Sequence, residues 1–259
     1  MVALSSVVIL RTGMSDDSSA SSLLERERRG SRLIFESMNG SLTSCLRCHI
    51  VLNKLRLVGI DVLVRARPYA SLRESLYQSG SPFVAATPKL DIETGYPTHR
   101  LTLYHESTCF RFLVEQWHQS EALNSHATQF EIWDWCAHVE FLLQEFRVSQ
   151  QVNNAQSLSY ANGGDRQWLL RTMGTHLAAI CAQLDTKRHA TLSHRVAHFI
   201  VGDSLSAADV SLFVLLLTLA RHESLLFTLF PFLEQYFWRL ARSEPFSSCQ
   251  EVLQAIPKL

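Results

Sequence analysis

The strongest constraint on the fold is a strand, a helix and a strand that follow one another within residues 32–66. The segment RLIFES (Arg32–Ser37) predicts a short strand, and IDVLVRA, from Ile60, predicts a second one rich in β-branched residues. Between them, apolar residues at three- and four-residue intervals predict a helix that starts at Cys45 and ends at Gly59. Strands joined through a helix run parallel, so this segment predicts a βαβ unit.

A second pair of strands follows after a polar region. The segments KLDI (Lys89–Ile92) and RLTLY (Arg100–Tyr104) are separated by a turn rich in glycine and proline, which predicts a hairpin. A helix is then expected from Ser107 to about Trp117. The first half therefore predicts an α/β domain with the order βαβ–ββα.

The second half predicts helices alone. Apolar residues recur at helical spacing in four segments, and a loop rich in Asn, Ser and Gly is expected at Gln151–Asp165. We expect a disordered tail at residues 1–30, the α/β domain at 31–118 and an all-α helical bundle at 125–259. The four helical segments are 130–146, 166–184, 206–222 and 231–242.

One helix start is encoded with particular clarity. Ser206 stands at a predicted N-cap and Asp209 three residues later, which is the spacing of a capping box. Leu205 and Val210 flank it as a hydrophobic staple does. This pattern concerns the fold and not the chemistry.

Composition excludes several function classes. The 259 residues are 47% hydrophobic and 19% charged with zero formal net charge, so no basic surface for nucleic acid is expected. The longest uncharged apolar run, Val210–Ala220, is too short to span a bilayer. Six scattered cysteines predict a reducing, cytoplasmic environment rather than a disulfide scaffold. The apolar N-terminus lacks a basic region, so secretion is not expected, and organellar targeting by this tail is the alternative to a cytoplasmic location.

Cys45 and Cys48 are the first candidate for chemistry. The helix dipole at the start of a helix lowers the pKa of a nearby thiol, and a cysteine three residues on can reach it to form a disulfide. The pair with His49 also fits a haem-attachment pattern, although the βαβ context argues against it. A zinc site needs four ligands, and no second pair with this spacing exists. Two structural cysteines and thiol chemistry both remain open.

Two further segments suggest contacts to a ligand. In ATPKL, a proline before a strand fits a cis turn at Thr87–Pro88, which would expose the backbone of Thr87 to an extended ligand. In HESTCF, Ser107 is expected to cap a helix whose free N–H groups attract an anion, and Glu106 could take an ammonium group. A strand-entry proline and an ordinary helix cap are the simpler alternatives.

In this order the segments resemble the cytosolic glutathione transferases, over about residues 32–246. SCLRCHIVLNKLRLVGI is similar to the first βαβ unit of their cysteine-containing omega and dehydroascorbate-reductase-like classes. TPKL resembles the cis-proline motif of that family, ESTCFRFL its Glu-Ser motif, and FIVGDSLSAADVSLF its helical capping box. Cys48 is an addition, and Leu46 and Arg47 replace the usual proline and aromatic residue.

The resemblance implies a thioredoxin-like domain followed by a helical one, with glutathione as cosubstrate. It implies a thiol transferase or oxidoreductase in which Cys45 attacks a mixed disulfide or an electrophile and Cys48 resolves the product. Thr87 and Pro88 would align the cysteinyl part of glutathione, and Glu106 with Ser107 its γ-glutamyl head. No metal is expected, and a homodimer is one assembly that the resemblance allows.

The substrate is expected between the domains, against Trp133 and Phe130, because ligand sites often lie at domain interfaces. A different class of function stays open. Domains of this kind also serve as non-enzymatic interaction modules in protein complexes, where neither the thiol chemistry nor the glutathione site is needed.

Overall fold

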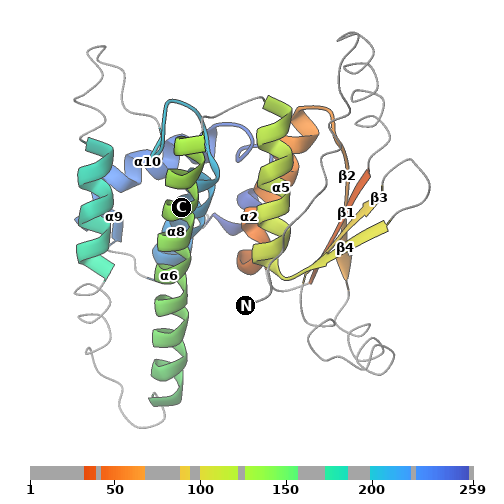
Figure 1. Ribbon diagram of the computed structural model, residues 1–259. Coiled ribbons are helices and arrows are strands. Elements are labelled where there is room, and N and C mark those ends of the chain that lie inside the picture. Colours follow the sequence, from red (N-terminus) through yellow and green to blue (C-terminus); the bar gives the residue numbers. More distant parts are fainter. Residues whose placement is uncertain are drawn as a thin grey trace, which may run out of the picture.

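The computed structural model describes eight segments, and they form an α/β unit followed by a helical unit (Figure 1). The predicted tail at residues 1–30 lies outside the described residues, as does Thr87. The described segments are 32–38, 42–67, 88–93, 100–121, 126–156, 173–185, 199–222 and 226–256.

The α/β unit is built on a four-stranded sheet with the strand order β2-β1-β3-β4. β1 pairs with β2 in parallel and with β3 antiparallel, and β3 pairs with β4 antiparallel. The predicted βαβ unit and the predicted hairpin are therefore both confirmed. The strands are β1 (Arg32–Met38), β2 (Asp61–Arg67), β3 (Lys89–Glu93) and β4 (Arg100–Tyr104).

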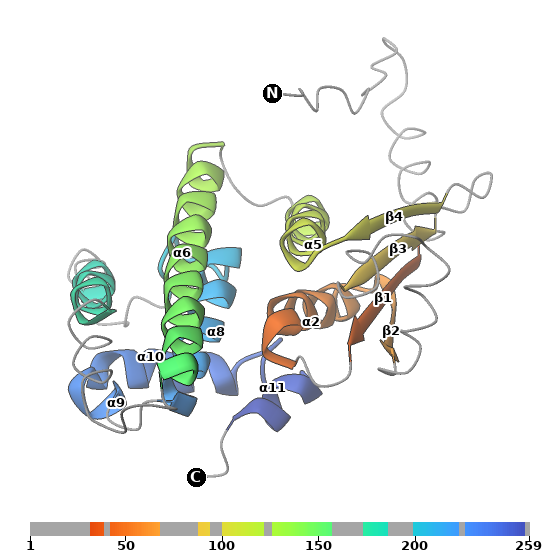
Figure 2. The same cartoon turned by 90° about the horizontal axis from the view of Figure 1, so that it is seen from below.

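Helices α2 (Leu42–Leu57) and α5 (Glu106–Glu121) cover the same face of the sheet (Figure 2). Alternate strand residues such as Phe35 and Leu90, which are opposite each other in the register, are buried beneath them. Side chains of successive strand residues point to opposite faces, and the neighbouring pair Ile34 and Asp91 is buried as well, so both faces of the two central strands are buried at this level.

The end of α2 is formed as the sequence predicts. Gly59 has φ +87°, a left-handed conformation that glycine adopts without steric penalty. Its N–H donates to the carbonyl of Arg56, and the N–H of Ile60 donates to that of Leu55, both at 3.0 Å. This is the Schellman arrangement, and it turns the chain directly into β2.

The helical unit is centred on α8 (Ala207–His222), whose residues 207–217 are all buried. α8 packs on α6 (His126–Gln156) and on α2, so it joins the helical unit to the α/β unit (Figure 2). Residues 173–185 are also helical. Three shorter helices complete the described part of the unit: α9 (Leu226–Leu229), α10 (Pro231–Arg242) and α11 (Gln250–Ala255).

The chain after α10 returns to the α/β unit. The Asn53 amide donates to the carbonyl of Pro245 at 2.7 Å and to the Ser248 hydroxyl at 2.9 Å, and α11 packs on α2. Residues near the C-terminus therefore cover α2 on the side away from the sheet.

The predicted loop at Gln151–Asp165 is wrong in its first part, because α6 continues to Gln156. Gln151 and Ala155 favour helix, and no glycine or proline occurs before Gly163. The polar residues up to Gln156 therefore continue a long helix rather than form a loop.

The half of the predicted capping box in which Asp209 reaches back to Ser206 is present. The backbone N–H of Ser206 donates to Asp209 Oδ2 at 2.9 Å, and α8 begins at the next residue, Ala207. The Ser206 hydroxyl also donates to Asp209 Oδ2, at 2.7 Å. The staple residues Leu205 and Val210 both pack in the core.

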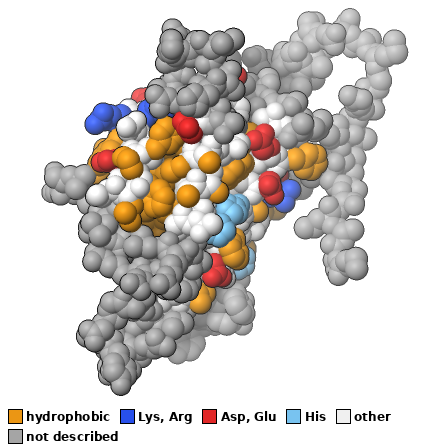
Figure 3. Space-filling model, turned by 90° about the vertical axis from the view of Figure 1, so that its left-hand side faces the viewer, with side chains coloured by type: hydrophobic (Ala, Val, Ile, Leu, Met, Phe, Trp, Pro, Cys, Tyr) orange, Lys and Arg blue, Asp and Glu red, His pale blue; other side chains and the backbone are white. Residues whose placement is uncertain are grey.

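Within the described segments, none of the helices has the length and apolar character needed to cross a membrane. Hydrophobic side chains nevertheless reach the surface of the helical unit, as the face in Figure 3 shows. On α6 the large ones are Phe130, Phe141 and Val148, which are 77%, 53% and 48% exposed.

Candidate functional site

The second turn of helix α2 lies beside the start of helix α5. The thiol of Cys48 on α2 is 3.6 Å from the backbone carbonyl oxygen of Glu106, the first residue of α5, and can donate to it. The structure therefore brings together two motifs that lie 58 residues apart in the sequence.

Cys45 is deeper in its helix than the sequence indicates. α2 begins at Leu42, so the prediction that the helix starts at Cys45 is wrong by three residues. Ser41, a residue type favoured at N-caps, directly precedes Leu42 and could have indicated this start. Cys45 remains nearer than Cys48 to the positive end of the helix dipole.

Both thiols face the core. Cys45 is 2% exposed and Cys48 is 0% exposed, and they are one helical turn apart. Burial raises the pKa of Cys48 well above its ordinary value, and the nearby charge of Glu106 raises it further. Cys48 is therefore a protonated thiol at neutral pH, while its catalytic role, like that of Cys45, stays a prediction.

Arg47 lies between these cysteines and is 4% exposed. Helical spacing places Arg47 on the face of α2 opposite most of its apolar residues, yet the side chain is buried. Its Nε donates to Glu106 Oε1 at 2.8 Å and its Nη2 to Oε2 at 2.9 Å, a bidentate pair. The guanidinium also lies 5.0 Å from the centre of the Phe110 ring. Burial alone would lower the pKa of Arg47, but Glu106 and Glu140 together raise it.

Glu140 of α6 completes this cluster from the helical unit. Its Oε2 lies 2.6 Å from Arg47 Nη2. Glu140 Oε2 is buried and has no hydrogen-bond partner, so this contact is a close charge pair and not a hydrogen bond. Arg47 and Glu140 were both missed by the sequence reasoning, since nothing local marks a residue whose partners are distant.

The first turn of α5 also differs from expectation. The helix begins at Glu106, so Ser107 lies inside the first turn and is not the N-cap. His105 precedes the helix with φ 70°, and its carbonyl accepts the N–H of Cys109 at 3.0 Å. Ser107 is exposed, so its hydroxyl is open to a ligand at the helix start.

The remaining predicted site residues lie outside the contacts that join Cys48 and Arg47 to Glu106. Pro88 is partly buried and directly precedes β3, while Thr87 lies outside the described residues. Trp133 lies under Arg111 of α5, with the guanidinium 5.5 Å from the indole centre. Trp133 precedes Glu140 by seven residues, or about 10 Å along α6. Trp133 and Phe130 are therefore displaced from the start of α2.

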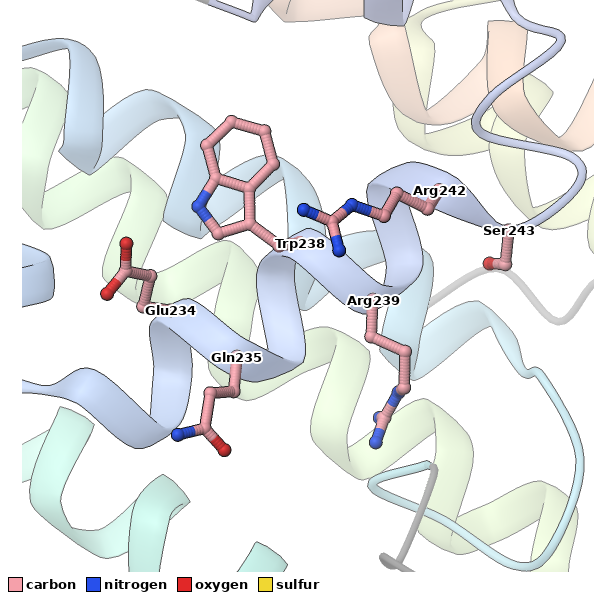
Figure 4. Close-up of a pocket in the computed structure, with 6 residues that line it drawn as sticks. All are labelled: Glu234, Gln235, Trp238, Arg239, Arg242 and Ser243. Carbon is pink, nitrogen blue, oxygen red and sulfur yellow. The ribbon is translucent and has the colours of Figure 1, made fainter. Parts of the chain in front are cut away.

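A separate cavity of about 440 Å³ opens on the helical unit (Figure 4). The predicted site residues that the structure describes are not among its lining residues. Its lining residues are Glu234, Gln235, Trp238, Arg239 and Arg242 of α10 with Ser243. Within the described segments, no group of three or more His, Cys, Asp or Glu side chains could hold a metal ion.

Neither a protein-family profile nor a curated protein sequence matches the chain. Solved structures are similar over nearly its whole length. A sigma-class glutathione transferase of Fasciola hepatica is 13% identical with a TM-score of 0.64, covering 89% of this chain and 99% of that one. Maleylacetoacetate isomerase from Anaeromyxobacter dehalogenans 2CP-1, solved with bound glutathione, is 19% identical with a TM-score of 0.61, covering 88% and 98%.

A third similar structure is Ure2p in complex with glutathione, at 16% identity and a TM-score of 0.61, covering 86% of this chain and 98% of that one. Ure2p is also described as a yeast prion protein with a nitrogen regulation fragment. Together these likenesses confirm the predicted fold, a thioredoxin-like unit followed by a helical one. The omega or dehydroascorbate-reductase-like class stays a prediction.

Proposed function

We propose that the chain is a glutathione-dependent transferase or thiol oxidoreductase that binds glutathione where α2 and α5 begin. The observation that carries this proposal is the contact between the Cys48 thiol and the Glu106 carbonyl, 3.6 Å long, which joins the cysteine motif to the Glu-Ser motif. Two structures of the same fold, the isomerase and Ure2p, contain glutathione.

The head of glutathione carries a carboxylate and an ammonium group on one carbon. Ser107 would donate to the carboxylate, aided by the free N–H groups of the first turn of α5. Glu106 would accept the ammonium group. Arg47 donates one hydrogen bond to each carboxylate oxygen of Glu106. A carboxylate can accept about four hydrogen bonds, so Glu106 keeps acceptor positions for the ammonium group. Thr87 and Pro88 would align the cysteinyl part.

The chemistry would be thiol–disulfide exchange. The Cys45 thiolate attacks the glutathionyl sulfur of a small-molecule or protein mixed disulfide, and the substrate leaves as a thiolate that takes up a proton. A second glutathione thiolate then attacks the glutathionyl sulfur of the Cys45–glutathione disulfide, which releases oxidised glutathione and restores the Cys45 thiolate. Alternatively, Cys48 loses its proton, attacks the Cys45 sulfur and releases glutathione as a thiolate; two glutathione molecules then reduce the Cys45–Cys48 disulfide and leave as oxidised glutathione. Because Cys45 is 2% exposed, the attack requires its sulfur to become accessible to the substrate.

Calorimetry with reduced glutathione tests the proposal directly. Wild-type protein should bind, and Ser107→Ala should raise the dissociation constant about tenfold, as expected for a lost hydrogen bond to a charged group. Thr108→Ala is a matched control, because Thr108 is the next residue of α5 and is also exposed. An absence of binding by the wild type would overturn the proposal.

A non-enzymatic interaction module is the second candidate. It is favoured by the burial of both cysteines and by the raised pKa of Cys48. Titration of the native protein with a thiol reagent separates the two functions. An enzyme should show one rapidly reacting thiol near neutral pH and should be retained on glutathione-agarose, whereas an interaction module should show neither property.

A further inference from the structure

Two carboxylates share one guanidinium where the units meet. Arg47 Nη2 lies 2.9 Å from Glu106 Oε2 and 2.6 Å from Glu140 Oε2. The three side chains therefore carry a net charge of −1 at neutral pH. Arg147 is the next cation, but its Nη1 is 3.9 Å from Glu140 Oε1 and its side chain is 47% exposed, so solvent screens it.

The neighbouring titratable groups do not cancel this charge. The thiol of Cys48 faces Glu106, and that of Cys136 on α6 lies within electrostatic reach of both Arg47 and Glu140. Burial raises the pKa of Cys48 well above its ordinary value and that of Cys136 to about 11, so both are neutral thiols at pH 7. Asp209 also lies near Cys136 but is engaged by Ser206, Ile200 and Tyr236.

The cluster changes what Glu106 can offer to a ligand. Its bidentate pair with Arg47 is neutral as a whole, and an ammonium group that approaches Glu106 also approaches the buried guanidinium. In a partly buried setting, unit charges separated by several ångströms interact strongly enough to change a ligand's affinity, so the guanidinium opposes binding of the ammonium group. The second carboxylate, Glu140, offsets this repulsion.

We propose that Glu140 is a positioning and specificity-determining residue that selects ligands with a free ammonium group. It acts through Arg47: it holds the guanidinium from the helical unit and leaves the Glu106 end of the site with an excess negative charge. The inference rests on the proposed glutathione function and adds a residue from the second unit to it. It also gives a chemical reason for the contact between Glu140 of α6 and Arg47 of α2.

The test compares two peptides by calorimetry: glutathione and glutaryl-Cys-Gly, in which hydrogen replaces the ammonium group. Wild-type protein should prefer glutathione at least about tenfold, and Glu140→Gln should lose about tenfold of that preference. Glu140→Asp should retain most of it, because the charge remains. Glu145→Gln, which removes the same charge from α6 about one and a half turns away, should behave as the wild type.

The outcomes are distinguishable. If Glu140→Gln lowers the melting temperature but keeps the full preference for glutathione, Glu140 is only structural and the inference is overturned. If the wild type binds both peptides equally well, the proposed function stands and the inference fails. If the wild type binds neither peptide, both the proposed function and the inference are overturned.

Discussion

The hydroxyl of Tyr236 on α10 donates a 2.6 Å hydrogen bond to Asp209 Oδ1 on α8, in a site where both residues are buried. The same oxygen accepts the N–H of Ile200 at 2.8 Å, and Oδ2 accepts two donors from Ser206. One carboxylate therefore fixes the start of α8, the chain before it and α10. Its burial is tolerated because every contact is a hydrogen bond to a charged acceptor.

Ser206→Ala should lower the free energy of unfolding by about 0.5–2 kcal/mol, the usual range for a lost N-cap side chain. The variant keeps the backbone donor but removes the hydroxyl that donates to Asp209 at 2.7 Å. Urea denaturation measures the change. Ser204→Ala, two residues earlier in the same segment, is the control and should be nearly neutral. Equal stability of both variants would remove the assigned role of Ser206.

Local signals in the sequence were sufficient for much of the fold. Gly59 ends α2 and Ser206 precedes α8 as predicted, because each feature depends on residues within one or two turns. The pairings of β1 with β2 and of β3 with β4 also followed from local patterns, since a helix between two strands makes them parallel and a short turn makes them antiparallel. The antiparallel pairing of β1 with β3, which sets the order of the sheet, was not predicted, because it joins segments that are distant in the sequence.

The charged part of the candidate site could not be predicted in the same way. The spacing of apolar residues placed Arg47 on the polar face of α2, but its partner Glu106 is 59 residues away. Glu140 lies on a helix of the other unit. Whether an arginine is solvated or buried depends on partners that only the tertiary structure brings close, and a buried charge occurs only where such partners exist.

Arg47→Met should lower the free energy of unfolding by about 3 kcal/mol. Removing one member of a buried ion pair leaves uncompensated charges, and the low end of the usual range applies because Glu140 is partly exposed. Arg47→Lys keeps the charge but loses the bidentate geometry, so its loss should be smaller. Urea denaturation at neutral pH compares them.

A double variant tests the origin of that loss. Glu140→Gln in the Arg47→Met background removes one of the two unpaired carboxylates, so the double variant should lose less stability than the sum of the single variants. Strictly additive losses would show that Arg47 and Glu140 do not interact, despite the 2.6 Å contact.

Because of Cys109 on α5, we expect the stability of the protein to fall at alkaline pH. Burial raises the pKa of Cys109 from 9.0 to about 12. Below pH 9 both the folded and the unfolded thiol are protonated, and the contribution to stability is complete. As the pH rises from about 9 towards 12, only the unfolded state loses the proton, so the free energy of unfolding falls by up to about 1.4 kcal/mol per pH unit.

Cys109→Ala should therefore show a shallower decline in stability above pH 9 than the wild type. Urea denaturation at a series of values from about pH 8 to pH 10.5 measures the two slopes. Thr108→Ala alters the preceding residue of α5 without changing a titratable group, and it should keep the wild-type slope. Identical slopes for Cys109→Ala and the wild type would contradict the raised pKa.

The two cysteines of α2 should differ in reactivity and in function. Cys45 is nearer the positive end of the helix dipole, while burial and Glu106 raise the pKa of Cys48 well above its ordinary value. Iodoacetamide should therefore label Cys45 before Cys48 in the native protein, at a pH below the free-cysteine pKa of about 8.5. Peptide mass spectrometry after short exposure identifies the labelled residue.

Thiol–disulfide exchange requires the attacking thiol and not the resolving one, because glutathione itself can resolve the intermediate. Cys45→Ser should abolish exchange with a glutathionylated peptide. Cys48→Ser should keep substantial turnover and accumulate a protein–glutathione adduct, visible by intact mass. Cys181→Ser, a partly buried cysteine of the helical unit, is the control and should keep both the rate and the labelling pattern. Full turnover in Cys45→Ser would make the pair structural, and the interaction module would then be the better account of this chain.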